Sequence, residues 1–285
     1  MESIDQIRIN FDKDNLFILN LCLAFLMFGV ALDLQLSKFR LIAKNPKVLL
    51  VGLSSQLILL PLLTLLLIYI FRPVSSMALG MILVASCPGG NVSNYAVHIA
   101  QANIELSVVL TSISNLGAIL ITPLYFFVLT DFLPEGSSPE TAISVNPSEM
   151  LSTLIQLVFI PVIAGLGVQK KFPAVAEKLK QPVQNLSMVL FFALIIAALA
   201  SNFEQIKNHL HLVFLIVIVH NLIALATGYN WARLFRLPLA DARAISIETG
   251  IQNSGLGLVI IFSFFEGLGG MALIAAWWGI WHLIS

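Results

Sequence analysis

The sequence predicts an all-α membrane protein that crosses the bilayer several times. Of its 285 residues, 58% are hydrophobic and only 11% are charged, whereas an average soluble domain has roughly 25% charged residues. The apolar residues gather in long runs, and one spanning helix needs about 20 residues. The apolar residues therefore suffice for about eight to ten membrane crossings, and little of the chain is left for a separate soluble domain.

Apolar runs interrupted by charged or turn-forming residues divide the chain into candidate membrane helices. The nine ranges are 15–32, 48–71, 75–101, 104–130, 149–168, 183–200, 210–229, 244–265 and 270–285. Residues 1–14 lack the positively charged leader of a signal peptide, so we expect a short, solvated extracytoplasmic arm. The last range ends at Ser285 without a basic flank, which suggests a C-terminus that has been truncated.

Basic residues are distributed unequally between the two sides of this arrangement. Eleven of the fifteen lysines and arginines fall in the three connections 33–47, 169–182 and 230–243, which lie on one side. That side is expected to be cytoplasmic, because cytoplasmic loops carry the excess of Lys and Arg. The acidic loop 132–148 then lies outside. The sequence predicts a plasma (inner) membrane protein with its N-terminus outside and its C-terminus in the cytoplasm.

Charge and cysteine content exclude other classes of partner. Fifteen basic and fifteen acidic residues leave no positive excess for nucleic acid. Cys22 and Cys87 lie in apolar runs without CxxC spacing, so we expect small core residues. The histidines form no HExxH motif and no Ser-His-acid order with a recognisable elbow. A membrane-embedded enzyme is therefore disfavoured.

Two of the predicted spans contain a break. In the third span, Pro88-Gly89-Gly90 removes a backbone donor and weakens the helix, and polar residues continue the break over 88–94. In the eighth span, a Gly- and Asn-containing stretch covers 249–257. Backbone groups freed within a bilayer need partners, so such breaks persist mainly where they line a cavity. A simple kink is the alternative.

The two breaks occupy matching positions in two halves of the chain. Gln56 lies 33 residues before Gly89, and Asn221 lies 32 residues before Asn253. Paired interrupted spans are typical of transporters whose binding site is formed by inverted repeats. The predicted repeats cover 15–131, with four helices, and 149–285, with five.

Glu248 is the one acid within a span that is flanked by further polar groups. An unpaired carboxylate in a membrane helix costs several kcal/mol. No lysine or arginine lies in the interior of any predicted span. The counter-charge is then a bound metal ion or a proton, unless Glu248 reaches the cytoplasmic interface instead.

Oxygen-bearing side chains accompany this carboxylate. Ser107 and Thr111 are four residues apart and so share one face of the fourth span. Hydroxyls in membrane helices often bond their own backbone, but with Ser93 and Asn94 they supply the oxygen ligands that a hard cation such as Na⁺ requires. A half-helix that starts at the first break would present free N–H groups to an anion. Together these features predict cation-coupled uptake of an organic anion.

At these motifs the sequence resembles the bile acid:sodium symporter family, over essentially the whole chain. The elements Pro-Gly-Gly-Asn-x-Ser-Asn and Glu-Thr-Gly-x-Gln-Asn are specific when they occur together. The matching segments are 28–32, 45–47, Gln56 with Pro61, 88–94, 103–111, 220–221, 248–255 and 281–282.

The resemblance implies inverted repeats folded into a panel domain and a core domain, with the two broken helices crossing in the core. The predicted count of nine helices resembles that of family members that lack the first helix of the ten-helix proteins. The implied ligands of one sodium site are Ser93, Asn94, Ser107, Thr111 and Glu248. Those of a second are Gln56, Glu248 and Gln252 with the backbone carbonyls of Thr249 and Ile251. The implied substrate contacts are Asn91, Val92, Asn253 and Ser254.

The last helix departs from the family pattern. Relatives often carry Asn after the Trp-His pair, whereas this chain has Leu283, so a steroid is not specifically implied. The expected substrate is a bile acid-like anion or a small carboxylate such as pantoate or a keto acid, carried by a monomeric transport unit. Proton coupling, a related exporter, and a channel or receptor remain as alternatives.

Overall fold

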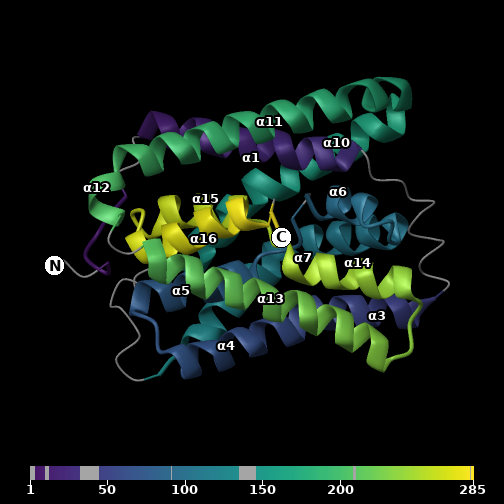
Figure 1. Ribbon diagram of the computed structural model, residues 1–285. Coiled ribbons are helices and arrows are strands. Elements are labelled where there is room, and N and C mark those ends of the chain that lie inside the picture. Colours follow the sequence, from purple (N-terminus) through teal and green to yellow (C-terminus); the bar gives the residue numbers. More distant parts are fainter. Residues whose placement is uncertain are drawn as a thin grey trace.

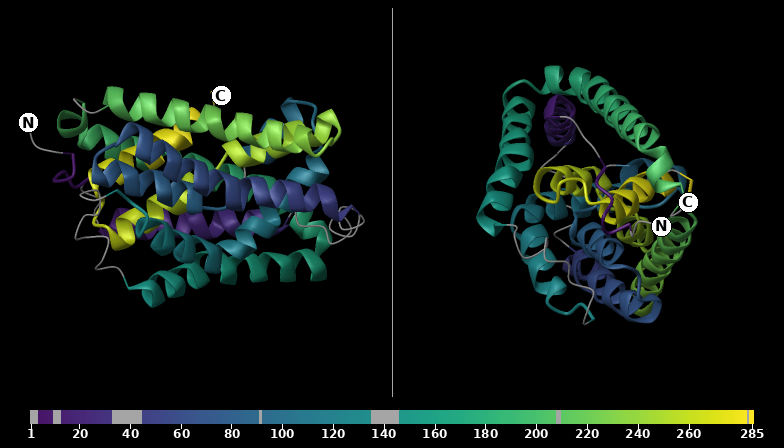
Figure 2. Two further views of the ribbon diagram at one scale, coloured as in Figure 1. Left: turned by 90° about the horizontal axis from the view of Figure 1, so that it is seen from below. Right: turned by 90° about the vertical axis from the view of Figure 1, so that its left-hand side faces the viewer.

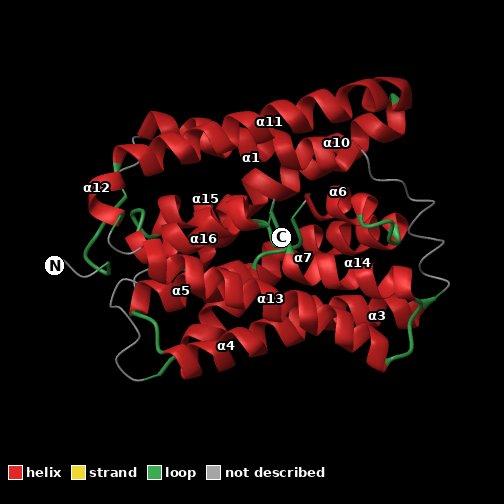
Figure 3. Ribbon diagram, in the orientation of Figure 1, coloured by secondary structure: helices red, strands yellow, loops and turns green. Residues whose placement is uncertain are grey.

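The computed structural model describes residues 4–9, 13–32, 45–90, 92–134, 146–207, 210–282 and 284–285. In this part of the chain the regular secondary structure is helical, and two isolated β-bridges are the only other pairing (Figure 3). Six helices are long and apolar enough to cross a membrane, and three shorter apolar helices accompany them. The chain is therefore a polytopic all-α membrane protein. The number of crossings stays a prediction.

Most helices begin and end near the limits expected from the apolar runs. Those of the first half are α1 (Lys13–Leu32), α3 (Pro46–Ser54), η1 (Ser55–Leu59), α4 (Leu60–Phe71), α5 (Ser75–Ser86), α6 (Val92–Ile99) and α7 (Ile104–Thr130). Those of the second half are α9 (Pro147–Leu154), η2 (Ile155–Phe159), α10 (Ile160–Lys171), α11 (Pro173–Ser201), α12 (Phe203–Ile206), α13 (Leu210–Leu234), α14 (Leu239–Gly250), α15 (Ser254–Phe264) and α16 (Gly269–Trp281).

The helices form two groups. Helices α1, α10 and α11 pack against one another along one edge of the molecule, and we call them the outer layer (Figure 1). Helices α3 to α7 and α13 to α16 form the inner body, in which α13 packs on α14, and α5 on α16. The end-on view shows the outer layer curving around one side of the inner body (Figure 2). Contacts between α1 and α15 join the two groups.

Two of the long helices each contain one π-helical turn, η1 and η2. Both turns are followed at the second position of the next helix by a proline, Pro61 or Pro161. A proline cannot donate to the carbonyl four residues before it, so the backbone can widen there. Turns of this kind frequently mark functional sites, and η1 places the buried side chains of Ser55 and Gln56 toward α14.

Helix α11 begins well before the predicted limit of residue 183. It starts at Pro173, a position where proline's missing N–H costs nothing, and its charged first turns hold an ion pair of 3.1 Å between Glu177 and Lys180. The basic residues had suggested a loop there. Helix α14 likewise begins at Leu239 rather than residue 244.

The N-terminal arm packs on the inner body, so the expectation of a solvated segment is wrong for residues 4–9. Ile4, Ile7 and Ile9 are buried. The Ile9 N–H donates to the Gly267 carbonyl at 2.8 Å, and the Gly269 N–H donates to the Ile7 carbonyl at 2.9 Å. In the sequence, these three isoleucines alternate with polar and charged residues, so they do not by themselves predict an arm that packs on the protein.

The same arm satisfies one of the free N–H groups in the first turn of α5. The Asp5 carboxylate accepts a hydrogen bond from the Ser76 N–H at 2.8 Å. An acidic side chain at a helix N-terminus complements the helix dipole. The arm thus ties the start of α5 to the turn between α15 and α16.

Helices α5 and α16 approach very closely at Gly80. A Cβ atom on this residue would lie 2.9 Å from the Met271 Cα and 3.2 Å from the Met271 carbonyl oxygen. Because these are backbone atoms, they cannot rotate away. We predict that Gly80→Ala lowers the free energy of unfolding by about 1–3 kcal/mol, measured as a lower melting temperature in detergent.

Gly167→Ala is the matched control, because nothing lies within 4 Å of the Cβ that it would add. Alanine also favours a helix over glycine, so its melting temperature should equal or exceed that of the wild type. A Gly80→Ala protein that is as stable as the wild type would contradict the close packing of α5 on α16.

Candidate functional site

The two predicted breaks are present, and both are narrower than expected. Helix α5 ends at Ser86 and α6 begins at Val92, so the last residues of the expected range 88–94 are already helical. Helix α14 ends at Gly250 and α15 begins at Ser254, within the expected range 249–257. Here the Asn253 side chain accepts a hydrogen bond from the Leu256 N–H at 3.0 Å. This N-cap restarts the helix earlier than glycine content alone suggested.

The two breaks cross and satisfy each other's backbone. The Gly90 N–H donates to the Ile251 carbonyl at 2.9 Å, and the Asn253 N–H donates to the Pro88 carbonyl at 2.8 Å. Gly89 and Gln252 form the antiparallel bridge between these bonds. Groups that a bilayer could not solvate are therefore paired within the protein. The crossing expected from the family resemblance is present.

Glu248 lies beside this crossing and is 1% exposed. Its Oε1 atom accepts a hydrogen bond of 2.5 Å from the Ser93 hydroxyl and another from the Ser107 hydroxyl. The Thr111 hydroxyl lies 2.9 Å from each carboxylate oxygen. No lysine, arginine or histidine of the described residues forms an ion pair with it. Helices α6, α7 and α14 thus meet around one buried carboxylate.

The oxygens in this cluster outnumber the hydrogens that could lie between them. Each hydroxyl has one hydrogen, yet Ser107 Oγ also lies 2.8 Å from Asn94 Oδ1, and Thr111 Oγ1 also lies 2.9 Å from the Ser107 carbonyl. When Glu248 is ionised, some of these close oxygen pairs therefore have no hydrogen between them. A small cation among these oxygens would relieve that repulsion, and the donor set fits a hard ion.

A second polar group lies beside Gly89, next to the Glu248 cluster. The Gln56 Nε2 atom is 3.4 Å from the Glu248 carbonyl and from Gln252 Oε1, while its buried Oε1 atom has no partner in the described part of the chain. The Gln252 amide in turn donates to the Thr249 carbonyl at 2.9 Å. Every residue of the second predicted sodium site thus lies at the crossing.

A cavity of about 500 Å³ lies between the crossing and the outer layer. Val92, Asn253 and Ser254, three of the predicted substrate contacts, line it together with Gln252. The fourth, Asn91, lies outside the described residues, as does Leu283. A second cavity of about 350 Å³ reaches Asn94 and Thr111.

Several residues at the site were missed by sequence reasoning. From α11, the amides of Gln181, Gln184 and Asn185 line the larger cavity, and Tyr95 borders both cavities. Spacing of i, i+3 and i+4 would have placed the three amides on one helix face. Gln181 falls in the expected connection 169–182, whereas Gln184 and Asn185 lie within the expected span 183–200, so the shared face was not recognised.

Other sequence expectations concern the packed interior. Cys22 and Cys87 are buried free thiols, as predicted. His220 is buried, with Nε2 2.7 Å from the Thr64 hydroxyl, and Thr64 itself donates to the Leu60 carbonyl. This histidine therefore joins α13 to α4.

Comparison with known proteins assigns the chain to a family. The model of the sodium bile acid symporter family matches residues 20–209. The chain belongs to this family. The family resemblance is thereby confirmed, and the function class is sodium-dependent transport across a membrane.

Two relatives illustrate the range of the sodium bile acid symporter family. The chain is 32% identical over 264 residues to YocS, an uncharacterized sodium-dependent transporter of Bacillus subtilis, covering 92% of this chain and 78% of that protein. It is 29% identical over 270 residues to BASS2, a probable chloroplastic sodium/metabolite cotransporter of rice, covering 90% of this chain. The chain spans 62% of the rice protein's length.

Gly89 lets the two polar groups approach each other. A Cβ atom there would lie 2.8 Å from Glu248 Oε2 and 3.0 Å from Gln56 Nε2. We predict that Gly89→Ala displaces both side chains and at least halves the sodium-induced rise in melting temperature. In Gly257→Ala, the added Cβ would have ordinary contacts of 3.7 Å and 3.9 Å, and the sodium response should be retained. An unchanged response in Gly89→Ala would contradict this geometry.

Proposed function

We propose that the protein is a sodium-coupled secondary active symporter that imports an organic anion by alternating access. The observation that carries this proposal is the buried Glu248 carboxylate, surrounded by hydroxyl groups and without a basic partner among the described residues. Such a group needs a cation for its charge to be tolerated. The membership of the chain in a sodium-dependent family supports Na⁺ as that cation.

The first sodium ion would lie among five side chains. Three hydroxyls already converge on Glu248, and the Asn94 carbonyl oxygen lies against one of them. The side chains of this proposed site are Ser93, Asn94, Ser107, Thr111 and Glu248. They come from three helices, so a bound ion would hold α6, α7 and α14 together.

A second ion would lie on the Gln56 side of the crossing. The unpartnered Gln56 oxygen and the Gln252 amide oxygen would both face it. Carbonyl groups at unwound helix ends coordinate Na⁺ in transporters with broken helices. The carbonyls proposed here belong to Thr249 and Ile251, each of which already accepts one hydrogen bond and retains a second lone pair.

The substrate anion would lie in the 500 Å³ cavity. Val92 and Ser254 begin the half-helices α6 and α15, whose N-terminal N–H groups favour a negative charge. Asn253 Nδ2 is buried without a partner in the described residues and can donate to a carboxylate. We include Asn91 in this contact set by its position between Gly90 and Val92.

Alternating access would result from movement between the outer layer and the inner body. The larger cavity has walls from both groups, whereas the crossing lies within the inner body alone. Because the two breaks bond to each other, they would move as one unit. We assign the end of α6 and start of α7, which border the smaller cavity, to the cytoplasmic side of a plasma membrane, with one chain as the transport unit.

We predict that purified protein in liposomes accumulates an organic anion only when an inward Na⁺ gradient is applied. Replacement of Na⁺ by choline at constant pH should reduce uptake to the level of empty liposomes. Glu248→Gln should abolish accumulation, because the neutral amide removes the charge that the cation compensates. The measurement is uptake of radiolabelled pantoate and cholate.

Glu204→Gln is the control, since Glu204 is exposed and pairs only locally with Lys207; it should transport as the wild type does. Uptake that follows a pH gradient and ignores sodium would reject sodium coupling in favour of the proton. Accumulation by Glu248→Gln equal to that of the wild type would remove this residue from the mechanism.

The two sodium sites can be separated by substitution. We predict that Gln56→Leu, which removes an amide from the second site alone, leaves one functional sodium site. The Hill coefficient for Na⁺ should then fall to one from a higher wild-type value, because cooperativity needs two coupled sites. Sodium dependence of uptake rate is the measurement. A wild-type coefficient of one, or an unchanged coefficient in Gln56→Leu, would count against the second site.

A further inference from the structure

The wall that the outer layer contributes to the larger cavity is polar at one end and apolar along the rest. Its residues on α11 include Gln181, Asn185, Met188 and Phe191, which are spaced so that they share one helix face. The wall is therefore polar over its first turn and apolar over the next two. Leu23 of α1 extends the apolar part. A ligand that fills this cavity meets amides at one end of the wall and hydrocarbon along the rest.

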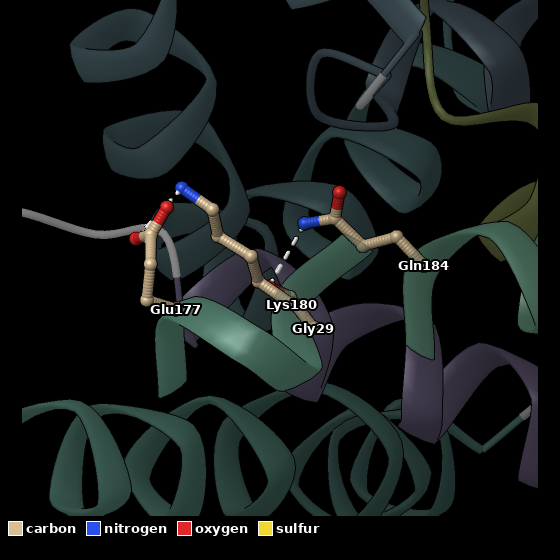
Figure 4. Close-up of polar contacts among 4 residues, drawn as sticks. All are labelled: Gly29, Glu177, Lys180 and Gln184. Atoms are coloured by element: carbon tan, nitrogen blue, oxygen red, sulfur yellow. Dashed lines mark hydrogen bonds and ion pairs between the residues drawn. The ribbon is translucent and has the colours of Figure 1, made fainter. Parts of the chain in front are cut away.

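One of the α11 amides has a structural partner. Gln184 donates from Nε2 to the Gly29 carbonyl of α1 at 2.8 Å (Figure 4). A Cβ atom on Gly29 would lie 2.8 Å from the Gln184 Cγ, so the two helices pack closely at this bond. Gln184 therefore holds α11 against α1, and its substitution would disturb the outer layer itself.

The other two amides each keep a polar group that is free to hydrogen-bond a ligand. Gln181 donates from Nε2 to Asn185 Oδ1 at 2.9 Å. This bond leaves the Gln181 oxygen as an acceptor and the Asn185 Nδ2 group as a donor, without partners in the described part of the chain. Both side chains are exposed and border the cavity. A hydroxyl group can both accept and donate, so it matches this pair in a way that a second carboxylate does not.

The charge of the cavity also restricts its ligand. The lining contributed by the described residues includes no lysine, arginine, aspartate or glutamate, and its one histidine, His282, is buried at the end of α16, away from the outer layer. One carboxylate can be held by the half-helix N-termini and Asn253 at the inner wall, but a second negative charge at the outer wall would have no counter-charge. A neutral polar group there is the chemical complement.

From these observations, and resting on the proposed function, we infer that Gln181 and Asn185 are specificity-determining residues. They hydrogen-bond a hydroxyl group of a singly charged organic anion whose carboxylate lies at the helix crossing. The apolar part of the ligand would then lie along the Met188 and Phe191 side of the wall. The outer layer thus takes part in substrate selection as well as in access.

The test compares matched pairs of monocarboxylates that differ in their hydroxyl groups. The pairs are pantoate with 3,3-dimethylbutanoate, and cholate with 5β-cholanate. Dissociation constants are measured by ligand-induced thermal stabilisation of the full chain, at saturating Na⁺ and again in choline. The wild type should prefer the hydroxylated member of at least one pair.

In Gln181→Leu and Asn185→Leu, binding of that hydroxylated member should weaken about tenfold, which corresponds to the loss of one good hydrogen bond. Binding of its partner without hydroxyls should change by less than about twofold. Both substituted residues are exposed, so folding should be retained. Gln156→Leu is the matched control: Gln156 is exposed in η2, lines neither cavity and donates only to Ser152 within its own helix.

A wild type that distinguishes neither pair, or variants that keep its full preference, would overturn the inference. The sodium arm is independent of this result. A hydroxyl preference that collapses in the variants but is the same in Na⁺ and choline would support the role of the two amides while rejecting sodium coupling. A hydroxyl preference that the variants retain, together with sodium-dependent binding, would reject the role of the two amides while supporting sodium coupling.

Discussion

The arrangement of the inner body depends on one buried carboxylate that has hydroxyl neighbours in place of a base. Removing Glu248 from water is costly, and hydrogen bonds from Ser93, Ser107 and Thr111 offset only part of that cost. In the proposed site, a cation would complete the compensation, and it would bring α6, α7 and α14 together in doing so. Binding of the ion and close packing of the three helices would then be one event, which is the requirement for coupling.

The crossing of the two breaks gives this carboxylate a defined place. Gly90 and Asn253 exchange backbone bonds with the opposite segment, so neither break can rearrange without exposing polar groups to the bilayer. A rigid pair of broken helices suits a transporter whose binding site stays fixed while its surroundings move. The same pair contributes oxygens and helix N-terminal N–H groups, so the proposed cation and anion would lie close together without direct contact.

Sequence reasoning succeeded where local chemistry decides the structure. Glycine and proline marked both breaks, and the four-residue spacing of Ser107 and Thr111 placed both hydroxyls toward Glu248. It failed where contacts between distant segments of the chain decide the structure. The arm looked polar because its partner, the turn between α15 and α16, is more than 250 residues away. The face that Gln181 shares with Gln184 and Asn185 was missed because the lysines before Gln181 suggested a loop as far as residue 182. In the structure α11 begins at Pro173, and the Glu177–Lys180 ion pair lies within this helix, so the charged stretch is helical.

The docked arm has a practical consequence for handling the protein. Ile7 and Ile9 share backbone bonds with the segment that precedes α16, and Asp5 caps α5, so the first residues are components of the fold. A purification tag or fluorescent fusion joined directly before Ile4 would compete with these bonds and reduce yield.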